Sequence, residues 1–323
     1  MEKQNIDTLI PTKVPEDKVY TAYCDNYDSI HYLFVEFQFS WLQQAYEALK
    51  DLDKYNIIVY LYKENFVGLN EIFKVKSLNQ FYLNPRFNLE KINIIQISQE
   101  LRLSKETTRR KILELVEDGI LIKNKKSITV TLKAGLLQKP ENTIDSFSKI
   151  LQYVSFLLVK EKTVQNYYRK DFFIKKIKER FTQILAIFLE YQIEYLLTRK
   201  TLVNNDIEMW FIYGSVLYNQ IMYLKKSEVK NHYQKQWIEE VLNVGDKKGV
   251  NAMTISDLTG IPRPTVIRKL KVLLKQKNIY KDPNNLYYIS KGKLLTELNK
   301  QRLINIKNLS AIISRINNIV FFS

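Results

Sequence analysis

The chain has 323 residues, of which 46% are hydrophobic and 12% aromatic, and its 50 Lys and Arg against 34 Asp and Glu give a formal net charge of +16. This composition excludes a disordered or collagen-like chain, and the length indicates two domains of roughly 100–200 residues each. A net positive charge of this size favours a polyanionic partner, of which nucleic acid is one class.

Cysteine and histidine are too scarce for several classes of site. The single Cys24 and the two histidines, His31 and His232, exclude a disulfide framework and the usual zinc sites. Cys24 lies in an acidic, aromatic segment that should not lower a thiol pKa, so a passive cysteine is favoured over a catalytic pair with His31. We interpret both histidines as residues at helix starts. The sequence contains no phosphate-binding loop, dinucleotide-binding glycine pattern, HExxH or nucleophile elbow. We therefore expect no enzyme activity and no metal or cofactor.

The N-terminal part of the chain does not carry the basic excess. Residues 1–54 hold five Lys and ten acidic residues, a net of −5, and no apolar segment of a secretory signal. The most apolar stretch, residues 181–197, is interrupted by Glu190 and Glu194 and is shorter than the ~20 apolar residues that a membrane span needs. We expect a soluble, cytoplasmic protein. Within this N-terminal part, residues 31–50 are typical of a long amphipathic helix.

Residues 97–137 predict a helix, a tight turn, a second helix and two short strands. The first helix covers about 97–102, the turn lies at Arg102 and Leu103, and Ser104 is a favoured N-cap for the second helix. Gly119 can take the left-handed conformation that ends that helix. Strands are expected at 120–123 and 127–132, around a turn at 124–126. The buried face of the second helix is predicted from the helical spacing of Ile112, Leu115 and Val116.

Two further helices are expected between this segment and the C-terminal part. Phe147, Leu151, Val154 and Leu158 are spaced 4, 3 and 4 residues apart and predict a trailing helix that needs a helical partner. Residues 172–197 predict a second leading helix. Residues 145–225 contain 16 of the 40 aromatic residues. Their simplest interpretation is a core between helices, and the alternative is a pocket for an aromatic or lipophilic effector.

The same pattern recurs in residues 255–295 at a constant offset of 158 and without a gap. Ten of 41 positions are identical, and the apolar positions keep the same register. The second copy predicts a helix at 255–259, a turn at Gly260, a second helix from Pro262 that Asn278 ends, and strands at 279–281 and 286–290. A trailing helix is predicted from Ile306, Leu309, Ile313, Ile316 and Val320, which are spaced 3, 4, 3 and 4 residues apart.

Helix, turn, helix and hairpin is the order of a winged helix-turn-helix, and the second copy resembles the winged-helix transcriptional regulators of the MarR type. The resemblance rests on the segment Ile255-Ser256-Asp257-Leu258-Thr259-Gly260-Ile261-Pro262-Arg263-Pro264-Thr265-Val266-Ile267-Arg268-Lys269-Leu270 and on Ile289-Ser290-Lys291-Gly292-Lys293-Leu294-Leu295 after the hairpin. It implies a dimer joined through terminal helices. Because two copies occur in one chain, we expect a mainly α fold with small β-wings, in which two winged units joined and flanked by long amphipathic helices form an intramolecular pseudo-dimer. A homodimer of two whole chains is also possible.

The expected parts are an N-terminal segment 1–30, a first unit 31–160 with its core at 92–137, and a second unit 161–323 with its core at 250–295.

The two copies also carry most of the charge. The first has nine basic and five acidic residues, a net of +4, and the second has nine basic and two acidic residues, a net of +7. In a helix-turn-helix the second helix enters the major groove of DNA, and Lys and Arg neutralise phosphates. The groove-facing candidates of the first copy are Ser104, Lys105, Glu106, Arg109 and Arg110. Those of the second copy are Arg263, Pro264, Thr265, Ile267 and Arg268. The wing candidates, expected at phosphates or in the minor groove, are Lys123, Lys125, Lys126, Lys281, Asn284 and Asn285. The simpler alternative for such charges is a solvated helix face.

These features favour a sequence-specific regulator that binds double-stranded DNA through two non-identical winged helices on the nucleoid. The main alternative is a replication initiator of the plasmid or phage kind, which also resembles tandem winged helices and binds repeated origin sites. The long helices around the copies favour the regulator. A protein-binding module of the chromosome-segregation type is a third interpretation, which the basic second helices disfavour.

Overall fold

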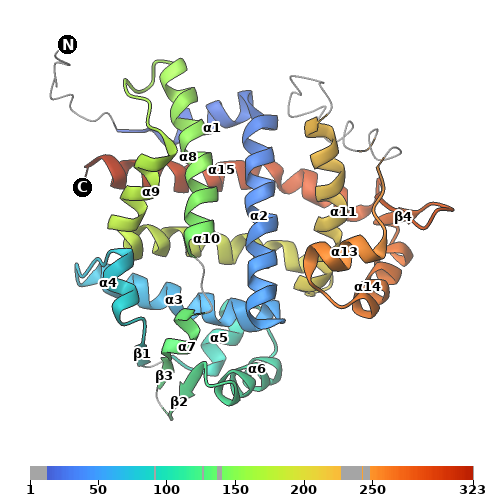
Figure 1. The fold of residues 1–323 in the computed structure, drawn as a ribbon, viewed down its shortest axis with the longest axis horizontal. Helices are drawn as coiled ribbons and strands as arrows, with labels where there is room; N and C mark the ends of the chain where they lie inside the picture. Colours follow the sequence, from blue (N-terminus) through green and yellow to red (C-terminus); the bar gives the residue numbers. More distant parts are fainter. Residues whose placement is uncertain are drawn as a thin grey trace.

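The computed structural model of the chain describes residues 13–90, 92–125, 127–136, 140–226, 242 and 248–322. It is mainly helical, with two small antiparallel sheets at two ends of the molecule (Figure 1). The mainly α class with small β elements is thus confirmed for the described residues.

The N-terminal half contains two long helices, a helix pair with a small sheet, and a further long helix. Its elements are α1 (Glu16–Asp25), α2 (Tyr27–Leu49), α3 (Leu52–Glu71), α4 (Leu78–Leu83), β1 (Phe87–Glu90), α5 (Ile94–Glu100), α6 (Lys105–Glu117), β2 (Leu121–Lys123), β3 (Ser127–Val130), α7 (Leu132–Leu136) and α8 (Pro140–Lys160). The sheet has the order β1-β3-β2, with Val130 of β3 opposite both Phe87 and Leu121. The sequence does not predict β1, whose four residues are too few for a clear alternating pattern.

The C-terminal half repeats this order. Its elements are α9 (Lys170–Glu179), α10 (Phe181–Thr201), α11 (Ile207–Lys226), α13 (Ala252–Thr259), α14 (Arg263–Lys275), β4 (Ile279–Lys281), β5 (Tyr287–Ile289) and α15 (Lys293–Phe322). Strands β4 and β5 pair antiparallel, and Val250 makes a single bridge to Tyr287 where β1 pairs in the first half. The order of helix, helix and hairpin therefore occurs in both copies, as the sequence predicts.

Turn and cap residues explain why the two helix pairs are built alike. Asn93 and Asn251, which are 158 residues apart, cap α5 and α13 by accepting hydrogen bonds from the backbone amides of Gln96 and Thr254. Gly119 ends α6 at φ 69°, as predicted. The prediction for Asn278 is wrong by one residue, because Lys277 takes the left-handed conformation at φ 56° and the amide of Asn278 then bonds the carbonyl of Leu273.

Four predicted helices have different limits in the structure. The short helices expected at about 97–102 and at 255–259 each begin three residues earlier, at Ile94 and Ala252. The helix expected over 172–197 is two helices, because Arg180 leaves the helical conformation at φ −114° and ψ 38°. This break lets α9 pack on α8 while α10 packs along α3. The helix expected over 31–50 begins earlier, at Tyr27. Within the expected segment 1–30, α1 packs on α15, and the expected boundary at residue 30 falls inside α2.

The two halves enclose one continuous core and contact each other in matched pairs. Within each half, α2 packs on α8 and α10 on α15; between the halves, α10 packs on α3 and α2 on α11, while α9 packs on α8 and α1 on α15. Where α2 meets α10, Gln38 and Gln192 exchange two amide hydrogen bonds of 2.9 Å each. The pairs are matched as in an approximate two-fold arrangement, and Figure 1 shows α2 and α8 of the first half running nearly perpendicular to their counterparts α10 and α15.

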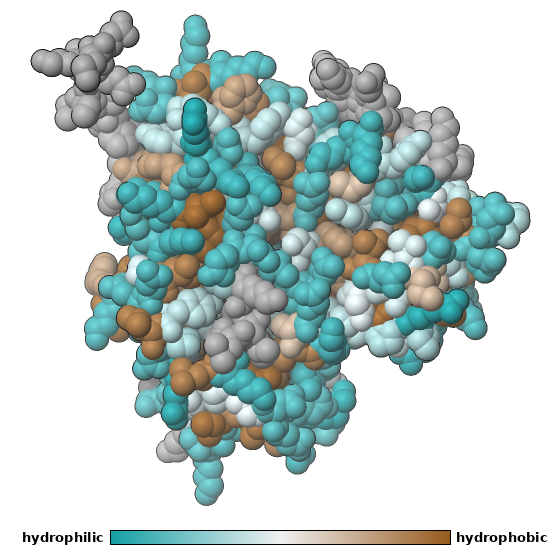
Figure 2. All heavy atoms as spheres, viewed as in Figure 1, coloured by the Kyte–Doolittle hydropathy of each residue, from teal (hydrophilic) through white to brown (hydrophobic). Residues whose placement is uncertain are grey.

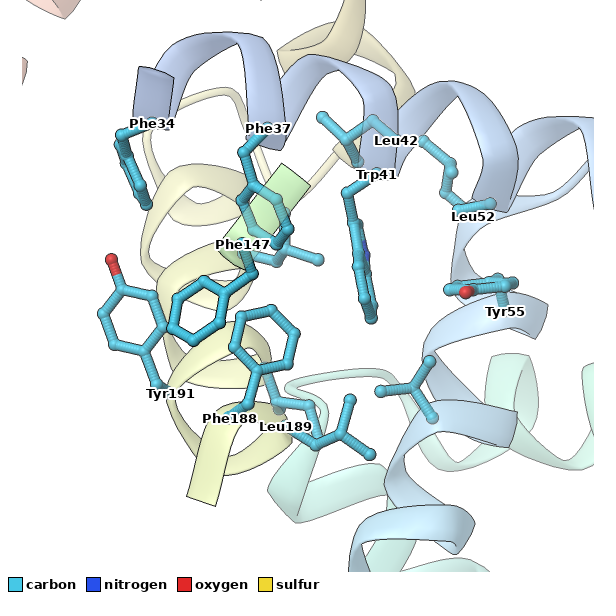
Figure 3. Packing of buried hydrophobic residues seen from close by; sticks show 14 of the residues in the cluster. Phe34, Phe37, Trp41, Leu42, Leu52, Tyr55, Phe147, Phe188, Leu189 and Tyr191 are labelled. Atoms are coloured by element: carbon cyan, nitrogen blue, oxygen red, sulfur yellow. The ribbon is translucent and has the colours of Figure 1, made fainter. Parts of the chain in front are cut away.

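Aromatic rings fill the centre of this arrangement. Phe37 of α2, Phe147 of α8 and Phe188 of α10 have ring centroids 5.3–5.9 Å apart, the spacing of favourable aromatic packing (Figure 3). The seams predicted for the trailing helices are confirmed. All of their positions are buried, namely Phe147, Leu151, Val154, Leu158, Ile306, Leu309, Ile313, Ile316 and Val320. Much of the aromatic content of residues 145–225 therefore serves as core, the simpler of its two interpretations.

Candidate nucleic-acid interface

Helix α6 presents the predicted groove-facing residues of the first copy on its exposed side. Ser104 caps it, with its hydroxyl accepting from the amide of Thr107 at 3.0 Å, and the helix buries Thr108, Lys111, Ile112 and Leu115. The predicted residues Ser104, Lys105, Glu106, Arg109 and Arg110 are all exposed. The structure therefore places them together at the N-terminal half of one helix.

Carboxylates neutralise part of the charge on α6. Arg110 lies 3.2 Å from Glu114, and Arg109 lies 3.9 Å from Glu106. Glu114 is also 2.9 Å from Lys54 of α3. The two arginine side chains nevertheless remain 64% and 62% exposed, so both can leave these pairs for another anion at little cost.

Helix α14 presents the second predicted set without such carboxylates. It begins after Pro262 and buries Val266, Lys269, Leu270 and Leu273. Arg263, Pro264 and Arg268 are exposed, whereas Thr265 and Ile267 are half-buried. Within the described ranges, no carboxylate lies within 4 Å of Arg263, Arg268, Lys271 or Lys275.

A buried ion pair holds each of these helices to the body of its half. Lys111 of α6 lies 2.5 Å from Asp51, the N-cap of α3, and Lys269 of α14 pairs in the same way with Asp206, whose carboxylate accepts from the amide of Met209 at the start of α11. Burial alone would raise the pKa of Asp51, but the hydrogen bonds from Lys111 and the amide of Lys54 hold it below the ordinary value.

Both copies of the repeat have lysine at this position, as Lys111 and Lys269, because each lysine forms an ion pair inside its own half. The sequence already contains the signal, because Lys111 is four residues before Leu115 and so lies on the apolar face of its helix. Sequence reasoning missed the role of both lysines, since their partners are about 60 residues away in the chain.

The hairpins place most of the predicted wing residues at the surface. Lys123 and Lys125 of the first hairpin are exposed, and Lys126 lies outside the described residues. Lys281, Asn284 and Asn285 of the second hairpin are also exposed, and Asn285 adopts φ 64° in a turn. Asp282 holds that turn by accepting from the amide of Leu286 at 2.8 Å. Figure 2 shows mainly hydrophilic side chains over both ends of the molecule, where α6 and α14 lie.

Two cavities lie among the long helices behind these surfaces. The first, about 270 Å³, is lined by residues of α2, α3, α4, α8 and α10, and Trp41, Tyr55 and Phe181 form part of its wall. The second, about 130 Å³, lies between α1, α2, α10, α11 and α15. Of the aromatic residues in which the sequence predicts an effector pocket, four line this second cavity, namely Tyr195, Trp210, Phe211 and Tyr218.

The residues considered for catalysis are not brought into an activated pair. Burial raises the pKa of the Cys24 thiol despite a hydrogen bond with Tyr20, whereas a reactive cysteine needs a lowered pKa. His31 is not at a helix start but in the second turn of α2, stacked at 4.7 Å on the ring of Tyr27. His232 lies outside the described residues.

Neither a metal-binding cluster nor a membrane-spanning helix is found among the described residues. Over the described ranges, no three His, Cys, Asp or Glu side chains are grouped so that they could hold a metal ion. Nor does any helix of the described part have the length and apolarity to cross a bilayer.

Comparison of the chain with models of protein families, with curated proteins and with solved structures finds no match.

Proposed function

We propose that the chain is a sequence-specific regulator that binds double-stranded DNA through two non-identical winged helices, arranged as a MarR-like pseudo-dimer. The observation that carries this proposal is the duplicated unit of helix, helix and hairpin, in which α6 and α14 expose basic residues at their N-terminal halves. In helix-turn-helix proteins the corresponding part of the second helix contacts base edges.

Matched packing supports a pseudo-dimer. The packing of α1 on α15 and of α9 on α8 joins each half to the terminal helix of the other, which is the kind of joint that the family resemblance implies. In such an arrangement the two recognition helices contact successive major grooves, roughly 34 Å apart. Since α6 and α14 expose different side chains, the preferred site is an imperfect inverted repeat or an asymmetric sequence.

Each set of exposed residues has a distinct task. Among the groove-facing arginines, Arg110 and Arg268 occupy the same position in the two copies, and an arginine recognises guanine through two hydrogen bonds. The methyl groups of Thr265 and Ile267 are suited to a thymine methyl. Lys123, Lys125, Lys281 and the two asparagines of the second hairpin contact phosphates or the minor groove.

The regulator acts in the cytoplasm on the nucleoid, without enzymatic activity and without a metal or cofactor, and a small aromatic or lipophilic effector controls it through a cavity between the long helices. The long helices that join the halves favour this function over a replication initiator.

Selection of bound sequences from a random duplex library with the full chain, followed by footprinting, tests the proposal. We expect one asymmetric site with two protected segments centred about one helical turn apart. Arg268→Ala should reduce protection of one segment more than of the other, and Arg110→Ala should do the reverse with a smaller loss. Repeated direct sites would favour the initiator, and a footprint in which one copy never contacts DNA would refute the two-helix arrangement.

A further inference from the structure

An open groove lies at the base of the second hairpin, between the end of α14 and the start of α15. Figure 1 shows this hairpin at the right edge of the molecule, beside α14. Four exposed lysines line the groove, namely Lys277, Lys281, Lys291 and Lys293. Among the described residues, no carboxylate lies within 4 Å of any of them. The nearby Asp282 is engaged in the hairpin turn, where it accepts from the amide of Leu286 at 2.8 Å. The groove therefore concentrates positive charge without an internal counter-ion.

Contacts of the backbone bring the lysines of this groove together. The hydroxyl of Ser290 donates to the carbonyl of Lys277, and the amide of Ser290 donates to the carbonyl of Asn278 at 3.2 Å. Glycine is required at position 292, because a Cβ on Gly292 would lie 2.4 Å from the carbonyl oxygen of Lys277. Residues 290–293 are thus held against the turn that follows α14, so the lysines on both segments line one groove.

The groove continues a row of cations on α14. Arg268, Lys271 and Lys275 are spaced three and four residues apart, so they lie on one face of the helix, and all three are exposed. Lys277 follows two residues after the last of them. Basic side chains therefore extend from the N-terminal half of α14, where base contacts are proposed, to the base of the hairpin.

The strand pairing shows which residues of the first copy occupy the same places. Ile279 pairs with Ile289 as Leu121 pairs with Val130, so the copies correspond at an offset of 158 before the hairpin turn and of 159 after it. A hydrogen bond agrees with this register. The hydroxyl of Thr131 donates to a carbonyl at the end of α6 as that of Ser290 does at the end of α14.

Three of the four lysines have uncharged counterparts in the first copy. They are Lys277, Lys291 and Lys293, which correspond to Gly119, Leu132 and Ala134. On α6, Leu113 and Glu117 interrupt the corresponding row of cations. Lys133 lies close by in the first copy, but its ammonium group donates to the carbonyl of Asp118 at 2.6 Å. The lysine groove thus belongs to the second copy alone.

Exposed lysines without carboxylate partners suit the phosphates of a nucleic acid, because neutralising them releases condensed counter-ions. We infer that this groove binds backbone phosphates of duplex DNA beyond the base pairs that α14 contacts, and that the first copy makes no matching contacts. The inference rests on the proposed function and deepens it, since the chain then covers a longer DNA segment on the side of its second copy.

Mapping of ethylated phosphates that interfere with binding of the full chain to its selected duplex tests the inference. We expect interfering phosphates to extend further outside one half-site than outside the other. The triple variant Lys277→Gln, Lys291→Gln, Lys293→Gln should lose this extension and reduce the slope of log affinity against log salt by about 3, as for three phosphate contacts.

A second triple variant provides a control of equal net charge. Lys160→Gln, Lys162→Gln, Lys307→Gln changes three exposed lysines outside both copies of the repeat and should keep the extension and the salt slope of the wild type. If the groove variant does not fold, by circular dichroism, the interference map of the wild type decides.

The outcomes separate the groove from the proposed function. Equal extension of the interfering phosphates on both sides, or equal reduction of the salt slope by the two triple variants, would overturn the inference and leave sequence-specific binding intact. If the chain binds random duplexes and selects no sequence, the proposed function is refuted, and the salt slopes of the two variants on those duplexes still decide for or against the groove. Failure to bind any duplex DNA at low salt would overturn both.

Discussion

The second helices of the two copies, α6 and α14, share a buried face and expose different charges. Each buries one lysine that pairs with the aspartate at the start of a preceding long helix, Asp51 before α3 or Asp206 before α11, and Lys269 also lies 3.4 Å from Glu208. On its other faces α6 carries Glu106, Glu114 and Glu117 among its cations, whereas α14 carries no acidic residue. The internal attachment has been kept while the exposed surface has changed, so the two copies are one scaffold with two surfaces.

We expect the two buried ion pairs to contribute equally to the free energy of unfolding in the two halves. Lys111→Met and Lys269→Met should each lower the free energy of unfolding by about 3 kcal/mol, because each leaves a half-buried aspartate without its partner. Chemical denaturation measures the loss. Lys271→Met, at an exposed position of α14, should change it by less than about 0.5 kcal/mol. A loss of stability in only one of the two variants would show that the two ion pairs do not hold α6 and α14 in the same way.

The two cavities should differ in their response to acid. His31 has a pKa of about 3 when folded and an ordinary value of 6.5, so the unfolded state binds more protons between these values and stability falls as the pH decreases from 6.5 toward 3. From pH 7.5 to pH 5 the loss from this group is about 2 kcal/mol. His31→Leu, which copies Leu185 at the corresponding position of the first cavity, should remove that part of the pH dependence in denaturation experiments.

A matched histidine control is available for this experiment. His232→Leu removes the only other histidine of the sequence, so the comparison of the two variants separates the contribution of His31 to the pH dependence of stability from that of His232. Identical acid sensitivity of His31→Leu and the wild type would contradict a neutral, buried His31.

The exposed arginines should differ in their contribution to DNA affinity. Arg268 has no carboxylate near it in the described part of the chain, whereas Arg110 must first leave Glu114. On the proposed function, Arg268→Ala should weaken binding to the selected site by about tenfold or more and relax specificity in one half-site, and Arg110→Ala should cost less. Binding curves on wild-type and half-site-scrambled duplexes measure both. A larger loss for Arg110→Ala would reverse the assignment.

The smallest effect is expected at the hairpins. Lys125→Ala should weaken binding to all sequences alike and reduce the slope of log affinity against log salt by about 1, as for the loss of one phosphate contact. A loss restricted to the selected sequence would instead indicate that Lys125 contacts bases.

The sequence predicts those parts of the fold that depend on neighbours in the chain. The helical spacing of Ile112 and Leu115 and the conformational freedom of Gly119 are local properties, and the helix, helix and hairpin follow from them. The break at Arg180 and the strand β1 were not predictable in this way, because both depend on packing against distant segments: α9 on α8, and β1 on β3.

The candidate surface was predicted better than the cavity. Exposed residues at the start of α6 and α14 follow from the register of each helix alone. Arg199 of the second cavity and Ala45 could not be matched beforehand, because α2 and α10 correspond at an offset of 154 and not at the 158 that the repeat displays. The offset of 154 follows only from the contact between Gln38 of α2 and Gln192 of α10 in the structure.

The reciprocal amide pair of Gln38 and Gln192 has a genetic consequence. In a homodimer with two-fold symmetry, one codon specifies both sides of every contact, so a change made for one binding site is imposed on the other. Here each glutamine has its own codon. The two side chains nevertheless form the same reciprocal contact that two copies of one residue form across a two-fold axis. Covalent linkage also keeps the halves at a high effective concentration, so neither must be identical to the other in order to associate. That freedom allows one gene to carry a histidine, His31, in one cavity and a leucine, Leu185, at the corresponding position of the other.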